Sequence, residues 1–137
     1  MNPLDIIAKY YPVGSEAYRI LVIHSRSVAY KPLAIARMHP EMNLDLTFVE
    51  EAAMLHDIGI FRCNAPDIDC HGDAEYICHG YLGAELMRAE GYPRHARVCE
   101  RHTGTGITLA MIEERGLPLP HRDFMPETLE EQLICYA

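Results

Sequence analysis

Residues 52–61, AAMLHDIGIF, place a histidine and an aspartate side by side at the end of an otherwise apolar run. Both side chains are costly to bury unless a partner replaces their lost hydration. His56 shares a helical face with Val49 and Ala53. Asp57 follows about 100° further round the same helix. The pattern predicts a helix whose end carries two side chains of metal-binding type into the core.

Three more histidines interrupt apolar stretches of other predicted helices. His24 follows Ile20 and Leu21 at helical spacing, so we expect it on the buried stripe of its helix, and His79 and His102 share apolar faces similarly. One such histidine is typically a core residue with satisfied hydrogen bonds, but four beside an aspartate need many more partners. A divalent metal satisfies them together, and imidazole with carboxylate suits iron, manganese, zinc or nickel better than calcium. The predicted metal ligands are therefore His24, His56, Asp57, His79 and His102.

The apolar spacing is helical almost throughout, and no stretch shows the sustained two-residue alternation of a strand. Residues 47–50, TFVE, match a capping box, and Gly59 is placed to end that helix. Pro32 is expected to kink or break a longer helix. The expected helices cover about 3–10, 16–38, 47–57, 77–90, 93–102, 109–115 and 129–137, with a loop at 60–75. The pattern predicts an all-α fold, a compact bundle of about six to seven helices. We expect residues 1–137 to form one domain, with the last helix still running at the end of the sequence.

Composition and charge limit the classes of partner. The 137 residues include 12 basic and 20 acidic side chains, a formal net charge of −8, which argues against a nucleic acid polymer or an anionic membrane. No apolar run approaches the roughly eighteen residues of a membrane span, and the N-terminus lacks a signal-peptide pattern. Five cysteines without a CxxC pair suit reduced thiols. We expect a cytoplasmic protein that acts on a small phosphorylated molecule, and the oligomeric state stays open.

The order of the histidines matches a known family. The motif MLHDIG at 54–59, preceded by His24 and followed by two more histidines, resembles the HD-domain superfamily of metal-dependent phosphohydrolases. The stretches HGYLGAELMRAEGY at 79–92 and ERHTGTGIT at 100–108 are similar to the small stand-alone HDIG-type proteins of bacteria and archaea. The resemblance covers about residues 15–137, and it implies an HD-domain-like helical bundle with one or two bound divalent metal ions.

The resemblance also implies roles for individual residues. The family's first metal-binding histidine corresponds to His24, and its histidine-aspartate doublet corresponds to His56 and Asp57. His79 and His102 correspond to the extra histidines of members with two metal ions, in which Asp57 would bridge both ions. His56 and Asp57 would then be catalytic, because Asp57 would also orient the attacking water.

The sequence departs from the family pattern at three places. Ile60 stands where catalytic relatives often carry a basic residue, and Thr103 stands where some members carry a further histidine. The family's last aspartate follows a pair resembling Tyr136-Ala137, at which this sequence ends. These departures keep a non-catalytic, metal-binding regulatory module as an alternative.

The predicted function is hydrolysis of a small, nucleotide-like phosphomonoester or phosphodiester by metal-activated water. Arg26, Arg62 and Arg101 are candidate phosphate ligands and Tyr81 a candidate substrate contact, although each residue type is also typical of an ordinary surface or core position. The polar loop at 64–73 either lines the rim of the pocket or is a solvated surface loop. A di-iron oxygenase is the second enzymatic alternative, because some HD-fold enzymes use the same ligands for oxygen chemistry.

Overall fold

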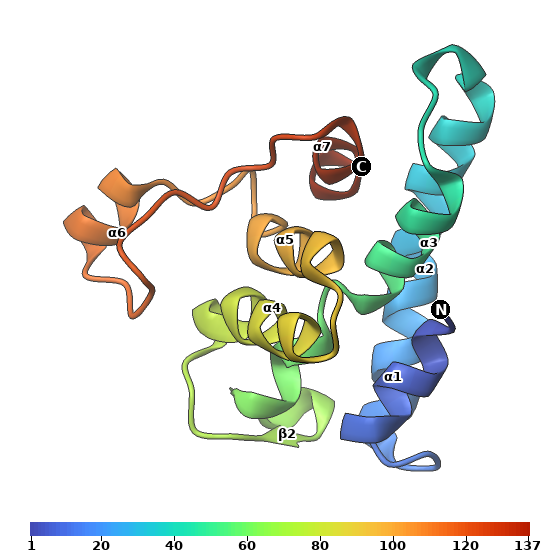
Figure 1. Cartoon of the computed structure of the whole chain (residues 1–137). Helices are drawn as coiled ribbons and strands as arrows, with labels where there is room; N and C mark the ends of the chain where they lie inside the picture. The colour runs from blue at the N-terminus through green and yellow to red at the C-terminus, as the bar shows by residue number, and fades with distance from the viewer.

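The computed structural model describes residues 1–137, and nearly all of its regular structure is helical (Figure 1). The α-helices are α1 (Pro3–Tyr10), α2 (Glu16–Met38), α3 (Leu46–Leu55), α4 (His79–Ala89), α5 (Pro93–Arg101), α6 (Leu109–Arg115) and α7 (Leu129–Tyr136). Short 3-10 helices are η1 (Pro40–Met42), η2 (Ile58–Arg62), η3 (Pro66–Ile68) and η4 (Tyr76–Cys78). The seven α-helices confirm the predicted all-α class. None of them combines the length and the apolar character that a bilayer crossing requires.

Side-chain caps explain where most helices begin. Helices α1, α2, α6 and α7 begin at their predicted residues, and at each start a side chain accepts a backbone N–H of the first turn: Asn2, Ser15, Thr108 and Thr128. The predicted start at Thr47 is wrong. Helix α3 begins at Leu46 because the carboxylate of Asp45 accepts a hydrogen bond of 3.1 Å from the N–H of Phe48. A capping carboxylate two residues earlier thus takes the place of the expected threonine.

The long helix α2 runs through Pro32 without a break, so the predicted break near this residue is wrong. Pro32 lacks an N–H and therefore leaves one carbonyl of the preceding turn without its helical partner. Its ring is almost fully buried, and α2 packs along α3 over this region. Burial of this face offsets the lost hydrogen bond, because tertiary packing contributes most of the stability of helices in proteins.

Two large apolar clusters join most of the helices, and a third, smaller one surrounds α6. In Figure 1, α1, α2 and α3 lie together, α4 and α5 lie side by side, and α6 extends away on an arm. One cluster joins α1, α2, α3, η2, α4 and α5 through residues such as Ile7, Leu55, Ile58 and Met87. The second cluster joins α2, α3, α5 and α7. Since α3 and α5 contribute to both clusters, the ends of these two helices are held firmly in the interior.

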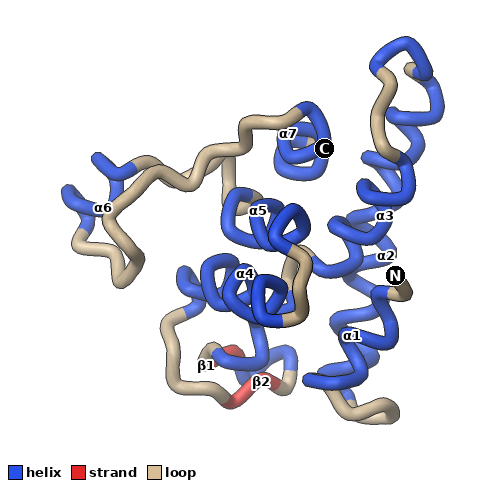
Figure 2. Tube along the Cα trace, viewed as in Figure 1, coloured by secondary structure: helices blue, strands red, loops and turns tan.

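The predicted loop at 60–75 has regular structure of its own. Strands β1 (Asn64–Ala65) and β2 (Cys70–His71) form a small antiparallel hairpin around η3, visible in Figure 2 below α4. The register pairs Asn64 with His71 and Ala65 with Cys70. The polar residues that obscured any period in the sequence lie largely on the exposed side of this hairpin, whereas Cys70 is buried.

Gly59 has a different role from the one predicted. Helix α3 already ends at Leu55, and Gly59 lies within η2 with an ordinary negative φ. A Cβ atom at this position would lie 2.2 Å from the carbonyl oxygen of His79 and 2.4 Å from the backbone nitrogen of Gly83. The missing side chain therefore allows the first turns of α4 to lie directly against η2. This close approach brings His79 next to Asp57.

Candidate metal centre

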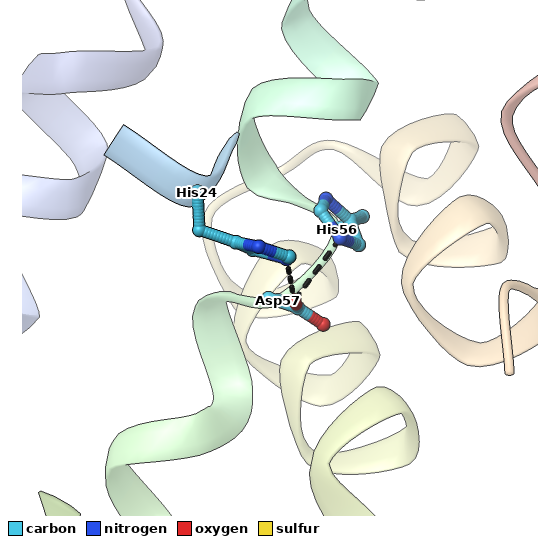
Figure 3. Close-up of side chains that lie close together, drawn as sticks. All are labelled: His24, His56 and Asp57. Carbon is cyan, nitrogen blue, oxygen red and sulfur yellow. Dashed lines mark hydrogen bonds and ion pairs between the residues drawn. The ribbon is translucent and has the colours of Figure 1, made fainter. Parts of the chain in front are cut away.

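Four helix segments bring the predicted ligands together. His24 lies in the middle of α2, His56 and Asp57 follow the end of α3, His79 is the first residue of α4, and His102 follows α5. The Nε2 atoms of His24 and His56 lie 2.8 Å and 3.0 Å from Oδ2 of Asp57, as the dashed lines in Figure 3 show. His24 and His56 therefore both contact the same oxygen of the Asp57 carboxylate.

The second carboxylate oxygen of Asp57 faces the other two histidines. Its Oδ1 lies 3.3 Å from Nε2 of His79 and 3.1 Å from Nε2 of His102. The Nε2 atoms of His79 and His102 are 3.1 Å apart. Asp57 thus lies between two pairs of imidazoles, with one oxygen directed at each pair.

Backbone carbonyls fix the orientation of three of the rings. The Nδ1 atoms of His56, His79 and His102 each lie 2.6 Å from the carbonyl oxygen three residues earlier. A carbonyl oxygen can only accept, so each Nδ1 carries the proton and donates it. In the neutral ring the Nε2 lone pair then points inward at Asp57, which is the arrangement of a metal-ligating histidine with an outer hydrogen bond.

This donor set fits a divalent metal ion. Lone pairs of three imidazoles that face an ionised carboxylate at about 3 Å repel one another unless a cation or protons lie between them. Two groups of three ligand atoms each lie within 4.8 Å of one another: His24, His56 and Asp57, and Asp57, His79 and His102. The residues present therefore fit one ion or two, and Asp57 belongs to both groups.

The electrostatics of the cluster keep Asp57 ionised. Burial by itself raises the pKa of this carboxyl, but the four imidazoles that surround it hold the pKa far below its usual range. The pKa of His24 is raised by its hydrogen bond to Asp57, whereas burial lowers the pKa of His102. At neutral pH the cluster thus presents a carboxylate, which attracts a cation.

His24 is more exposed than we predicted from the apolar residues around it in the sequence. Its side chain is 49% exposed, whereas those of His56, Asp57 and His79 are at most 7% exposed. The prediction of a buried position is wrong because the ring lies on the wall between two cavities instead of against another helix. The site can therefore be reached from solvent on the side of His24.

Two cavities meet at the cluster. A narrow one of about 180 Å³ has mainly apolar walls from α1, α2, η2 and the hairpin. A wider and more open one of about 360 Å³ contains all five ligands and is bordered by α7. His24, Asp57 and Tyr76 line both cavities. Ile68 and Cys70 of the hairpin line the narrow cavity, so part of the predicted polar loop does form a pocket wall.

The predicted substrate contacts lie outside both cavities. Arg101 is 11% exposed and forms an ion pair with Glu131 of α7, so its guanidinium is already held by a carboxylate. Arg26 is exposed on another face of α2, and Arg62 is exposed at the end of η2. The hydroxyl of Tyr81 donates to a glutamate one turn along α4. Their roles as substrate contacts stay predictions without support from position.

Tyr76 is the site residue that the sequence did not reveal. Its ring stacks on that of His79 with centroids 4.4 Å apart, and its carbonyl accepts the Nδ1 proton of His79. The only sequence signal was its place three residues before a predicted ligand, which does not distinguish it from the other seven tyrosines. Two of the departures from the family pattern also lie at the site: Ile60 lines the narrow cavity and Thr103 the wider one.

Buried ion pairs fix the end of α5 that carries His102. The side chain of Glu100 is 1% exposed and lies between two guanidinium groups. Arg88 of α4 donates to it at 2.6 Å and Arg122 donates at 3.0 Å. Burial raises the pKa of the Glu100 carboxyl, but the two arginines together lower it by more than burial raises it, so the net shift is downward. The pairs tie α4, α5 and the segment after α6 together beside the cluster.

A helical fold that directs four histidines at one buried aspartate defines a class of metal-binding α-helical domain. The chain belongs to the HD domain family, which it matches over residues 21–137. This agrees with the resemblance carried by the histidine-aspartate doublet. No solved structure shows a significant match to the chain.

Three relatives come from archaea. The chain is 33% identical to a tRNA (cytidine(56)-2'-O)-methyltransferase of Thermoplasma volcanium, over 98% of this chain and 34% of that protein. It is 31% identical to a protein of the same name from Picrophilus torridus, over 96% of this chain and 37% of the relative. An uncharacterized protein of Methanocaldococcus jannaschii is 38% identical over 77% of this chain and 55% of its own length. The chain thus spans between about a third and just over half of these relatives.

Proposed function

We propose that the chain is a metal-dependent phosphohydrolase that acts on a small phosphate ester. The observation that carries this proposal is the position of Asp57, an ionised carboxylate with each oxygen directed at a pair of imidazoles. Membership of the HD domain family supports the same reading. Carboxylate and imidazole ligands suit the divalent ions that assist hydrolysis.

Two groups of residues would hold the metal ions. His24, His56 and Asp57 would hold one ion, and Asp57, His79 and His102 would hold a second. A divalent ion bound there would supply Lewis acidity towards a phosphoryl oxygen and would lower the pKa of a bound water towards neutrality. The wider cavity is open enough to admit water and a phosphate group to the ligands. The backbone hydrogen bonds of the histidines keep the rings oriented, so that little reorganisation is needed during reaction.

Methylation of RNA is the second candidate, because two relatives carry the name of a tRNA methyltransferase. The match covers only about a third of each of those proteins, so the named activity need not reside in the matched part. The net charge of −8 disfavours binding of a polyanion by this chain. A buried carboxylate surrounded by imidazoles is suited to a metal ion. These points favour hydrolysis over methyl transfer and over direct binding of an RNA polymer.

The test combines metal analysis with an activity screen. We expect the protein expressed in supplemented medium to contain one or two equivalents of iron, manganese, zinc or nickel and to hydrolyse small phosphate esters. His56→Ala and Asp57→Ala should abolish both properties, while His39→Ala, which changes an exposed histidine paired with Glu41, should alter neither. Unchanged hydrolysis in the first two variants would refute the mechanism.

The same preparation distinguishes the alternatives. Oxygen consumption by a reduced iron-loaded protein that hydrolyses no ester would favour the oxygenase. Binding of S-adenosylmethionine with transfer of its methyl group to a tRNA transcript would favour the methyltransferase. Metal binding without any of these activities would favour the regulatory module.

A further inference from the structure

The narrow cavity beside Asp57 has almost entirely apolar walls. It is formed where the end of α1, the first half of α2, η2 and the hairpin face one another. Eight of its ten lining residues are hydrophobic. Its main walls are Tyr11, Ala17, Ile20, Leu21, Ile60 and Ile68.

Most polar atoms that line this cavity already have partners. The hydroxyl of Tyr11 donates to the carbonyl of Ile58 at 2.8 Å and accepts from the N–H of Phe61 at 2.9 Å. The thiol of Cys70 donates to a backbone carbonyl, and both oxygens of Asp57 are directed at the imidazoles. The Tyr76 hydroxyl and Nδ1 of His24 form no hydrogen bond within the protein, and both side chains are about half exposed. A nucleobase in this cavity would leave most of its polar edge without partners, which opposes binding.

The size of the cavity points in the same direction. Its volume is about 180 Å³. An apolar protein cavity of about 150 Å³ is known to bind benzene. The cavity can therefore hold one six-membered ring or a branched chain of about five carbons, but it cannot hold a purine nucleoside.

The cavity is continuous with the metal centre. His24 and Asp57 form part of its wall and also line the wider cavity that contains the other ligands. A phosphate group beside the ligands would place the adjoining organic group of an ester at the entrance of the narrow cavity. Since burial of apolar surface is favourable, the shape selects an organic group that carries no hydrogen-bonding edge.

We propose that this cavity receives the organic group of the substrate, and that the substrate is a small alkyl or aryl phosphate and not a nucleotide. The proposal rests on the proposed phosphohydrolase function, and it replaces the nucleotide-like substrate expected from sequence. Ala17 is the position at which it can be tested without touching a ligand, because a larger side chain there would fill the cavity.

The experiment uses the metal-loaded protein, a series of n-alkyl phosphates from methyl to heptyl, phenyl phosphate and AMP. We expect kcat/KM to rise about fourfold for each added methylene up to pentyl, and AMP to be at least tenfold poorer than phenyl phosphate. Ala17→Leu should abolish the dependence on chain length, because the leucine side chain fills the cavity. Ala34→Leu, a matched change further along α2 and outside the cavity, should leave the series as in the wild type.

Toluene binding, measured by NMR, tests the cavity independently of activity. We expect toluene to bind the wild type and Ala34→Leu but not Ala17→Leu. Ile68→Ala, which enlarges the cavity from the hairpin side, should shift the preference toward esters longer than pentyl. This variant tests the proposal if Ala17→Leu does not fold. Toluene binding without hydrolysis of any ester would refute the phosphohydrolase function and leave the apolar cavity supported. A rate independent of chain length, or a preference for AMP, would overturn the substrate proposal.

Discussion

Replacement of Gly59 by alanine should weaken metal binding although Gly59 is not a ligand. The new Cβ would lie 2.2 Å from the carbonyl oxygen of His79 and 2.9 Å from Cα of Gly83. Ordinary van der Waals contact begins at 3.4 Å, so η2 and α4 would have to separate by about 1 Å. The atoms in the way belong to helix backbone and cannot rotate aside as a flexible side chain can.

The magnitude follows from this displacement. Overpacking of a core costs about 1–3 kcal/mol, and we expect the upper part of that range here because backbone must move. His79 is the first residue of α4, so the same movement carries its Nε2 away from Asp57. Disturbance of groups that orient metal ligands typically costs about tenfold to hundredfold in metal affinity. We therefore expect Gly59→Ala to lose about 2–3 kcal/mol of unfolding free energy and to bind Mn²⁺ at least tenfold more weakly.

Gly83→Ala provides the matched control, because its Cβ would meet Gly59 at 3.1 Å and other atoms at 3.4 Å or more. A neighbour need shift only by tenths of an ångström, and alanine is favoured over glycine inside a helix by about 1 kcal/mol. We expect this variant to have nearly wild-type stability and Mn²⁺ affinity, measured by urea unfolding and isothermal titration. Wild-type values for Gly59→Ala, or equal losses in both variants, would refute the close-approach argument.

Three further predictions concern charge and metal. Asp57→Asn should bind no stoichiometric metal by elemental analysis, because the remaining imidazoles lose their only carboxylate; a full metal complement would contradict the shared-ligand reading. Addition of EDTA should lower the melting temperature by about 5–10 °C, since a metal at a hundred times its Kd contributes about 2.7 kcal/mol, and an unchanged transition would argue against a bound ion. Glu100→Gln should cost about 2 kcal/mol at neutral pH, because it leaves Arg88 and Arg122 beside an uncharged group. Because the pKa of Glu100 is lowered in the folded protein, its contribution to the free energy of unfolding is present above about pH 4.5 and is lost as pH falls through the folded-state pKa. The free energy of unfolding of the variant should therefore change less with pH over this acidic range than that of the wild type.

Local signals predicted the fold well wherever a single side chain decides the outcome. Asn2, Ser15, Thr108 and Thr128 cap helices through hydrogen bonds that involve only their own first turn. The sequence failed where distant packing overrides a local rule. Pro32 stays inside a continuous helix because its face is buried.

The candidate site shows the same division. The five predicted ligands were selected because polar residues on apolar faces are rare and because their order matches a family motif, and the structure brings all five together. The exposure of His24 and the stacking of Tyr76 on His79 depend on how α2, η4 and α4 pack together. No local pattern in the sequence encodes this packing. The sequence also could not show which of the candidate arginines are free to bind a phosphate, because the pairing of Arg101 with Glu131 joins residues thirty positions apart.

This division also explains why the ligand set alone does not define the substrate. The ligands come from α2, α3, α4 and α5, and their identities follow from what a metal ion accepts. The walls of the narrow cavity come from the end of α1, the first half of α2, η2 and the hairpin, and eight of its ten lining residues are not among those ligands. Ile60 is the informative residue here, because it stands where catalytic relatives often carry a basic side chain and forms part of the apolar wall. An apolar residue at that position removes one possible phosphate contact and adds surface for a hydrocarbon group. Under the proposed function, this departure from the family pattern corresponds to a change of substrate and not to a loss of catalysis.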